Sequence, residues 1–595
     1  MARTISALLV VACLMQSAIA QDVVSKFKDD KPQPPVKLLN LNDLVASPDT
    51  DFKWAELDLK NVNPADRQYT RYISLSYFSP ESTSQVDSEL SVVHNALRFW
   101  LPSLNLRRRV TKDPPLISNR LLRIDLRDYE LDKNSRTEIV ALSEASGVNF
   151  GFDQAERDRA INIWEAFVEK EVYYKVSAAS FALESQEAGP VQIIKTTPIM
   201  DGDKKIGEAT VGASYAALSI KDGWINIENG KINGWIKASD AKQVPLAAQV
   251  PIAAQRGWID PITHKVVTEL TQSQVPIVRA DWFLTYTSNP DPIGFYYDIM
   301  LFPKKESELF KMLGVDEKLI EQNRLVQGGA VIRSVVAQHN RELQVLPSLF
   351  GADVKFVWRS LDVINEVKDK SVLVKFAGSL QRDGSELIGT NNNGLHWYYA
   401  ADKDGNRIGI VPENIAQDKV AEVDNAIYDT RVITAYKCVK CHGRQAGIIP
   451  FKDVVSASRE QPGVGLATIL KDPKKIAFKS KIDDYYSSNL SDSISTHQGS
   501  YSKITQRTNG LTPEASSANF VQLIIRYQHY PITIAQSALE MGVDENEARQ
   551  LFLQSGDPEL LVLSTGVPIT RQKFEGSVHK GFNAKIYPWE KEINQ

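Results

Sequence analysis

Apolar and polar positions follow two periods in the first third of the chain. Alternation over Tyr72–Tyr77 and Leu121–Leu126 predicts two strands with one buried face. Apolar residues spaced by three and four positions over Ser88–Leu101 predict a helix. A second helix is expected over residues 153–175, with Asp153 as its N-terminal cap. This part of the chain is therefore expected to be an α+β region.

The middle of the chain shows two further patterns. Between residues 190 and 245, short alternating stretches are interrupted by Asp-Gly and Asn-Gly pairs, which are turn signals of β-hairpins and predict a small antiparallel barrel. Residues 275–425 again look α+β. The strands expected there are Pro276–Phe283, Val354–Trp358, Ser371–Phe376 and Leu395–Ala400, and the helices are Glu306–Leu313 and Asp316–Arg324.

The last part of the chain is predicted to be mostly helical, over residues 430–442, 491–506, 515–527, 532–541 and 545–553. The fold class is thus multidomain: α+β, then a small all-β barrel, then a mostly α-helical C-terminal domain. The expected organisation is a signal peptide (1–20), a flexible leader (21–60), an α+β region (61–185), a barrel (186–250), a second α+β region (251–425) and a helical domain (426–595).

Composition narrows the class of protein. The 595 residues are 43% hydrophobic and 24% charged. These fractions are ordinary for globular domains and exclude a chain that is disordered throughout. The 69 basic residues do not exceed the 73 acidic ones, so nucleic acid is not an expected partner.

The N-terminus resembles an export signal. Arg3 precedes an apolar run over Ile5–Met15, and Ala18-Ile19-Ala20 matches the small-x-small cleavage pattern. The run is short for a transmembrane span, and no later segment is apolar enough, so none is expected in the mature chain. An alternative is a lipoprotein acylated at Cys13. Both predict a periplasmic or cell-surface location.

Cleavage after Ala20 would leave only two of the three cysteines, Cys438 and Cys441, and His442 follows them directly. C-x-x-C-H is the attachment sequence of c-type haem. On a helix, positions i, i+3 and i+4 share a face, so both thiols can reach one edge of the porphyrin while His442 approaches the iron. The sequence therefore predicts one covalent haem c with His442 as an axial ligand.

Other uses of the two cysteines fit the sequence less well. A disulfide between residues three apart closes a very small loop and gains little entropy. A thioredoxin-like pair normally follows a strand in a βαβ unit, whereas a helix is expected here. A zinc site needs four ligands, and no second Cys/His pair exists.

The sequence offers several candidates for the second axial ligand. Met541 is the only methionine after the motif, and the alternatives are an open position or one of the histidines His396, His497, His529 and His579. The loop over residues 447–450 is a candidate for the carbonyl that orients His442 and for an apolar cover. Lys437, Lys440 and Arg444 flank the motif and suggest a docking surface for an acidic, unidentified redox partner protein.

Residues 186–250 resemble the bacterial Src-homology-three-like domain of exported proteins. The segments that carry the resemblance are Ile193–Met200, Gly212, Asp222-Gly223-Trp224 and Gly234-Trp235-Ile236. The resemblance implies either contact with cell-wall peptides or a spacer.

The run from Leu121 through residues 279–283 and 394–395 into Cys438–His442 resembles large exported bacterial proteins with one cytochrome c domain. This resemblance implies single-electron transfer, and it implies that the two α+β regions form one domain with the barrel inserted. Two other functions remain open: a haem-dependent redox enzyme or ligand-binding haem protein, and a cell-surface binding or scaffold protein that uses the barrel.

Overall fold

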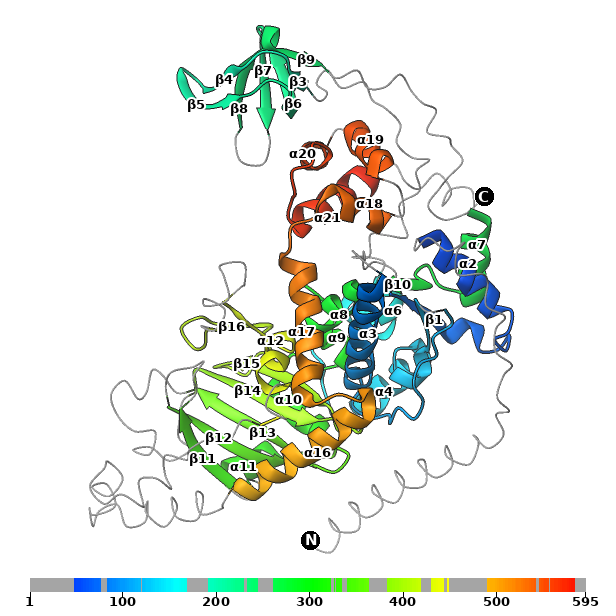
Figure 1. Ribbon diagram of the computed structural model, residues 1–595. Helices are drawn as coiled ribbons and strands as arrows, with labels where there is room; N and C mark the ends of the chain where they lie inside the picture. Colours follow the sequence, from blue (N-terminus) through cyan, green and yellow to red (C-terminus); the bar gives the residue numbers. More distant parts are fainter. Residues whose placement is uncertain are drawn as a thin grey trace, which may run out of the picture. The chain divides into compact units, whose positions relative to one another are not determined.

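The computed structural model (Figure 1) describes part of the 595 residues. The predicted signal peptide, the leader up to residue 47 and the predicted strand Ser371–Phe376 lie outside it. The described residues are 48–75, 83–118, 120–167, 191–228, 233–243, 261–322, 326, 328–333, 340–362, 382–418, 430–443, 447–448, 490–541, 545–555 and 557–583.

A three-stranded sheet is formed by segments that precede and follow the predicted barrel in the sequence. Its order is β10 (Ile277–Arg279), β1 (Thr70–Ser74), β2 (Leu121–Asp125). β1 runs antiparallel to β2 and parallel to β10, with Tyr72 opposite Ile277. The two α+β regions therefore share a sheet, although residues 191–243 separate them in the sequence.

Helices of these regions supply much of a large aromatic and aliphatic core. They are α3 (Thr83–Trp100), α4 (Lys133–Ala145), α5 (Gln154–Ile161), α6 (Ile163–Ala166), α8 (Ala280–Ser288), α9 (Tyr296–Met300), α10 (Glu306–Leu313) and α11 (Glu317–Glu321). The same regions contain α2 (Pro48–Leu59) and α7 (Pro261–Thr271). Short 3₁₀ turns are η2 (Arg67–Tyr69), η3 (Leu101–Leu104), η4 (Leu126–Tyr129) and η8 (Ala238–Asp240).

Two local predictions needed correction. Asp153 does cap α5, in a reciprocal capping box with Glu156, but the helix stops at Asn162 before α6 begins. The strand predicted over Pro276–Phe283 ends at Arg279, where α8 starts. Asp281 accepts hydrogen bonds from the Arg279 Nε–H (2.9 Å) and the Trp282 N–H (2.8 Å) at this start. The apolar residues there are buried on all sides, so their periodicity does not separate strand from helix.

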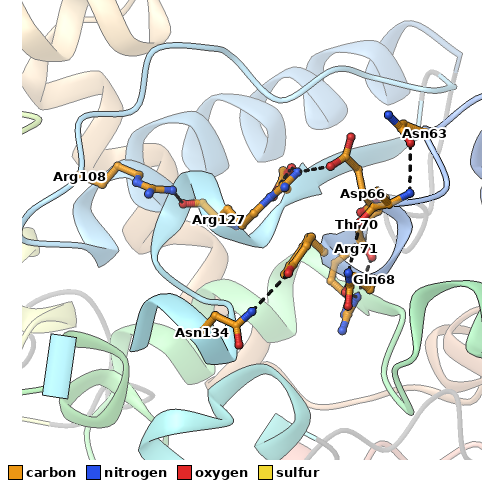
Figure 2. A network of polar contacts seen from close by, with 11 residues as sticks. Asn63, Asp66, Gln68, Thr70, Arg71, Arg108, Arg127 and Asn134 are labelled. Atoms are coloured by element: carbon orange, nitrogen blue, oxygen red, sulfur yellow. Dashed lines mark hydrogen bonds and ion pairs between the residues drawn. The ribbon is translucent and has the colours of Figure 1, made fainter. Parts of the chain in front are cut away.

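A polar network fixes the segment before β1 to the end of β2 (Figure 2). Arg127 Nη2 lies 2.8 Å from Asp66 Oδ1 and 2.5 Å from Asp125 Oδ2. The Arg127 guanidinium also lies over the Tyr69 ring, 4.4 Å from its centroid, and Asn134 of α4 donates to the Tyr69 hydroxyl (3.3 Å). The charged side chains are half-exposed. We therefore infer that these contacts orient the two segments and add little to the free energy of unfolding.

Residues 191–243 form an antiparallel sheet of order β5-β4-β8-β7-β6-β3-β9. The turns at Asp201-Gly202 and Asp222-Gly223 join its hairpins as predicted, with φ of 58° at Gly202 and 78° at Gly223. No pairing between β5 and β9 is present among the residues described. The strands are β3 (Val191–Ile193), β4 (Thr197–Asp201), β5 (Lys204–Ala209), β6 (Ser214–Lys221), β7 (Trp224–Glu228), β8 (Asn233–Lys237) and β9 (Ala241–Gln243).

A five-stranded antiparallel meander follows, each strand pairing with the next in the chain. The sequence predicted its third and fifth strands. Its strands are β11 (Gly328–Arg333), β12 (Asn340–Pro347), β13 (Phe356–Asp362), β14 (Gly384–Thr390) and β15 (His396–Asp402), and the small pair β16 (Ile410–Val411) and β17 (Val432–Ile433) lies beyond it in the chain.

The C-terminal helices agree with four of the predicted ranges: α16 (Ser491–Asn509), α17 (Pro513–His529), α18 (Ile534–Met541) and α19 (Glu545–Ser555), followed by α20 (Pro558–Ser564) and α21 (Arg571–Asn583). Phe520 of α17 packs against Trp100 and Phe99 of α3, with ring centroids 4.5 and 5.9 Å apart. The helical part and the first α+β region thus share one core. None of the helices in the described ranges is both long and apolar enough to cross a bilayer.

Glu306 links α10 to the five-stranded sheet through buried charges. Its side chain is inaccessible to solvent, and Arg359 of β13 contacts both carboxylate oxygens, at 2.8 and 3.2 Å. Arg382 and the Ser385 hydroxyl also bind the Glu306 carboxylate. Burial alone would raise the pKa of Glu306, but the two guanidinium groups and the Ser385 hydrogen bond outweigh it and hold this pKa below its ordinary value.

Glu306→Gln is expected to destabilise the chain by about 3–5 kcal/mol, because it leaves two buried guanidinium groups without their counter-charge. The carboxylate is more acidic in the folded chain, so its stabilisation is complete above about pH 4.3 and decreases as the pH falls below that value. Urea unfolding between pH 3 and 7 measures both effects, and the variant should lose less stability on acidification than the parent.

The matched control is Glu269→Gln. Glu269 forms an exposed ion pair with Lys265 on α7 at 3.9 Å, and its loss should cost at most about 0.5 kcal/mol. Equal losses in the two variants would contradict the role assigned to the buried carboxylate.

Candidate haem site

The C-x-x-C-H segment lies on a tight, buried turn. β17 ends at Ile433, and Ala435 takes φ 67° and ψ −74°, with the Tyr436 N–H donating to the Thr434 carbonyl at 3.1 Å. This is a γ-turn with positive φ, which is rare and strained for a residue with a side chain. Such strain persists only where the surroundings hold it, and Ala435 and Tyr436 are fully buried.

The motif itself is helical, but not a regular α-helix. α12 (Tyr436–Cys438) passes into one π turn, η12 (Val439–Gly443). The helix predicted over residues 430–442 therefore starts later, since residues 432–433 are a strand. Single π turns inside helices are frequent at functional sites. They change the angular spacing of the side chains, here of Cys441 and His442 relative to Cys438.

Gly443 ends this turn because of its packing and not because of its backbone conformation. Its φ is not left-handed, so it is not a helix-stopping cap. A methyl group at Gly443 would lie 2.7 Å from the Ser517 side chain, whose hydroxyl donates to the Val439 carbonyl at 2.8 Å. Glycine is required here because α17 packs directly on the π turn.

The two cysteines form no disulfide and are partly buried. Burial raises the pKa of both thiols. A redox-active or nucleophilic cysteine has the opposite property, a lowered pKa. Among the described residues no group of three or more His, Cys, Asp or Glu side chains is arranged to hold a metal ion directly. Neither observation favours a thioredoxin-like pair or a zinc site.

His442 is oriented by the backbone five residues later. Its Nδ1 lies 3.1 Å from the Gly447 carbonyl oxygen, and the Gly447 N–H donates to the His442 carbonyl at 2.8 Å. A carbonyl only accepts, so Nδ1 carries the proton and Nε2 keeps its lone pair. Burial lowers the pKa of His442 to about 4, so the imidazole is neutral at pH 7. The prediction that the 447–450 loop supplies this carbonyl is confirmed.

Ile448 of the same loop is apolar and faces other protein residues. It is buried in a small cluster with Leu343, Val345, Trp358, Leu490 and Ile494. The remaining residues of the loop, Ile449 and Pro450, lie outside the described residues.

Gly447 also contacts two buried histidines from distant parts of the chain. A methyl group at this glycine would lie 2.9 Å from His497 Cδ2 and 3.0 Å from His396 Cε1. His396 begins β15 and His497 is in α16, and their Nε2 atoms are 2.7 Å apart. The structure thus brings together three of the predicted site histidines, His396, His442 and His497, around one glycine.

The other predicted ligands are placed differently. His529 ends α17, twelve residues after Ser517, so it lies about 18 Å along the helix axis from the residue that contacts the π turn. Met541 ends α18, and its side chain is outside the described residues, as is that of His579 in α21.

The lysines that flank the motif do not form a docking surface. Lys437 and Lys440 both contact Asp418 Oδ2, at 3.2 and 2.7 Å, and their side chains are only 3% and 12% exposed. The two lysines neutralise a buried carboxylate instead of facing a partner, and that prediction was wrong for them. Arg444 lies outside the described residues.

Comparison with known proteins adds no assignment: no family model, curated protein or solved structure matches this chain. The chemistry of the site therefore has to be argued from its own residues. Two unbridged cysteines and neutral imidazoles form a donor set that fits covalent haem.

Gly447→Ala tests the packing of this glycine. Its φ is 107°, so a methyl group adds backbone strain of about 1–2 kcal/mol. The clash with the two histidine rings should add about 1–3 kcal/mol more. Urea unfolding of the full chain measures the total loss of stability.

Gly510→Ala is the matched control. Gly510 follows α16 with φ 77°, but nothing lies within 4 Å of an added methyl group. Gly510→Ala should therefore lose only the stability that corresponds to backbone strain. Equal costs for the two substitutions would mean that the histidines do not pack against Gly447.

Proposed function

We propose that the chain is an exported c-type cytochrome that carries one covalent haem and transfers single electrons. One observation supports this most directly: the C-x-x-C pair is followed by a histidine whose Nδ1–H donates to a backbone carbonyl. Iron-ligating histidines usually have such a partner, because it fixes the tautomer that leaves Nε2 free.

Each residue of the motif has a distinct task in this proposal. Cys438 and Cys441 hold the haem through thioether bonds, which require reduced thiols. His442 offers Nε2 as a neutral donor, since its burial keeps it unprotonated at pH 7. When bound, haem c supplies a reversible one-electron couple whose potential depends on the axial ligands and the burial.

The surroundings suit electron transfer because they are preorganised. Ile433, Tyr436 and Val439 belong to the same core as residues of α3, α8 and α17. A rigid, apolar environment limits rearrangement when the charge of the iron changes. Export, which this proposal also requires, is supported by the signal-like residues 1–20.

The test is expression with a cytochrome c maturation system, followed by a pyridine haemochrome spectrum and a haem-stained denaturing gel. One covalent haem per chain is expected. The Cys438→Ala/Cys441→Ala double variant should retain no covalent haem, because no thioether can form.

Cys13→Ala is the matched control and should leave haem attachment unchanged, since the third cysteine lies in the signal-like segment. A mature wild-type protein that emerges from this system without covalent haem would refute the proposed function.

A further inference from the structure

The histidine pair beside Gly447 has no role in attaching a haem. His396 is buried and His497 is inaccessible to solvent. Burial lowers the pKa of both rings, in the case of His497 to about 4, so both are neutral at pH 7. Buried imidazoles cost more free energy than apolar side chains of similar size unless their ring nitrogens find partners. The contacts of the pair therefore indicate what it does.

Hydrogen bonds give each ring of the pair one tautomer. The Trp358 indole Nε1–H only donates, and it lies 3.0 Å from His497 Nδ1. His497 Nδ1 therefore accepts, and the proton of this neutral ring is on Nε2. The two Nε2 atoms are 2.7 Å apart, so His396 Nε2 accepts and its own proton is on Nδ1. The Tyr398 hydroxyl lies 3.2 Å from this Nδ1 and accepts from it. Both rings are thus held at both nitrogens.

The elements that hold the pair are distant in the sequence from the C-x-x-C-H motif. Trp358 is in β13. His396 and Tyr398 are in β15, and His497 is in α16. Tyr501, one turn after His497 in α16, stacks on the His396 ring with centroids 3.9 Å apart and planes inclined by 10°. The five-stranded sheet and α16 therefore fix the pair in place.

The pair occupies the space where a side chain of residue 447 would stand. A methyl group there would lie 2.9 Å from His497 Cδ2, and 3.0 and 3.1 Å from His396 Cε1 and Nε2. The polar atoms of Gly447 contact His442 instead. The Gly447 N–H donates to the His442 carbonyl at 2.8 Å, and the Gly447 carbonyl accepts from His442 Nδ1 at 3.1 Å. The pair therefore packs behind the Nδ1 edge of His442, on the residue that binds this edge.

The hydrogen bond between His442 and Gly447 affects how strongly the imidazole binds iron. A carbonyl that accepts from Nδ1–H raises the basicity of the ring, which favours ferric over ferrous iron and lowers the reduction potential. This bond weakens when its length or angle departs from the optimum. A glycine with φ 107° has wide backbone freedom and does not fix its own carbonyl. The surroundings of Gly447 therefore have to fix it.

We propose that His396 and His497 are positioning residues that hold the Gly447 carbonyl against His442 Nδ1 and thereby lower the reduction potential of the haem. The pair does not bind the iron and acts through Gly447 alone. Its ring nitrogens serve to lock the two rings, since an apolar side chain would fill the space without a hydrogen bond to stop its rotation. This inference rests on the proposed function, because it assumes a haem at Cys438–His442.

The first measurement is a spectroelectrochemical titration of the full haem-loaded chain. His396→Ala and His497→Ala should each raise the reduction potential, because a displaced carbonyl weakens the hydrogen bond to His442 Nδ1. The absorption spectra of both oxidation states should keep the spin state of the parent, because neither residue is a ligand. An unchanged potential in either variant, or a changed spin state, would overturn the proposal.

Two further variants separate positioning from general loosening of the chain. In His497→Gln, the amide oxygen can accept from Trp358 and the amide NH₂ can donate to His396, so its potential should be closer to the parent's than that of His497→Ala. His264→Ala is the matched control. Burial also lowers the pKa of His264 to about 4, but this ring stacks on Phe52 of α2, with centroids 5.1 Å apart. The control should lose stability without a shift in potential, and a shift as large as that of His497→Ala would contradict the proposal.

A double-mutant cycle tests whether the pair acts through Gly447. Gly447→Ala should raise the potential and lower the stability to urea, because its methyl group pushes against both rings and moves its own carbonyl. In the His396→Ala background the methyl group enters the vacated space, so both effects of Gly447→Ala should be smaller than in the parent. Additive shifts in potential and additive losses of stability would refute the coupling.

The cycle has a second route if His396→Ala does not accumulate. His497→Ala can replace it, since His497 Cδ2 is the atom nearest the added methyl group. Absence of covalent haem in the wild type refutes the proposed function itself, whereas unshifted potentials in a haem-loaded chain refute only the positioning role. The two failures are therefore distinguishable.

Discussion

The backbone of Gly447 is the constraint on which the site depends. Its carbonyl accepts the His442 Nδ1–H, while its missing side chain leaves room for the rings of His396 and His497. Its φ of 107° is open to glycine at little cost. A side chain at this position would press against the rings of His396 and His497. One residue therefore fixes the tautomer of His442 and packs against the histidine pair.

Burying neutral imidazoles costs free energy unless their nitrogens find partners. The pair meets this requirement in a chain of three contacts, from Trp358 through His497 and His396 to Tyr398. Such a chain has one consistent set of proton positions, because it starts at a group that only donates. The order of donors and acceptors, rather than distance alone, distinguishes the two histidines.

The large N-terminal part of the chain contributes directly to this environment. β1 pairs with β10, although residues 191–243 lie between them in the sequence. α3 packs against α17, and α17 contacts the π turn. The motif residues Ile433, Tyr436 and Val439 belong to the resulting core. Asp418 neutralises the neighbouring lysines inside the structure, so the charges beside the motif serve the fold and not an outer surface.

The sequence by itself determined the local features: the C-x-x-C-H motif, the Asp-Gly turns, the Asp153 cap, most strands and helices, and the carbonyl acceptor in the 447–450 loop. These depend on neighbouring residues, whose spacing is visible in the sequence. Only the tertiary structure decided which histidines meet, because His396 and His497 are 101 positions apart and neither lies in a motif. It also decided the burial of Lys437 and the end of β10 at Arg279. In each case, long-range packing outweighs the local pattern, and a single sequence does not encode such contacts in its periodicity.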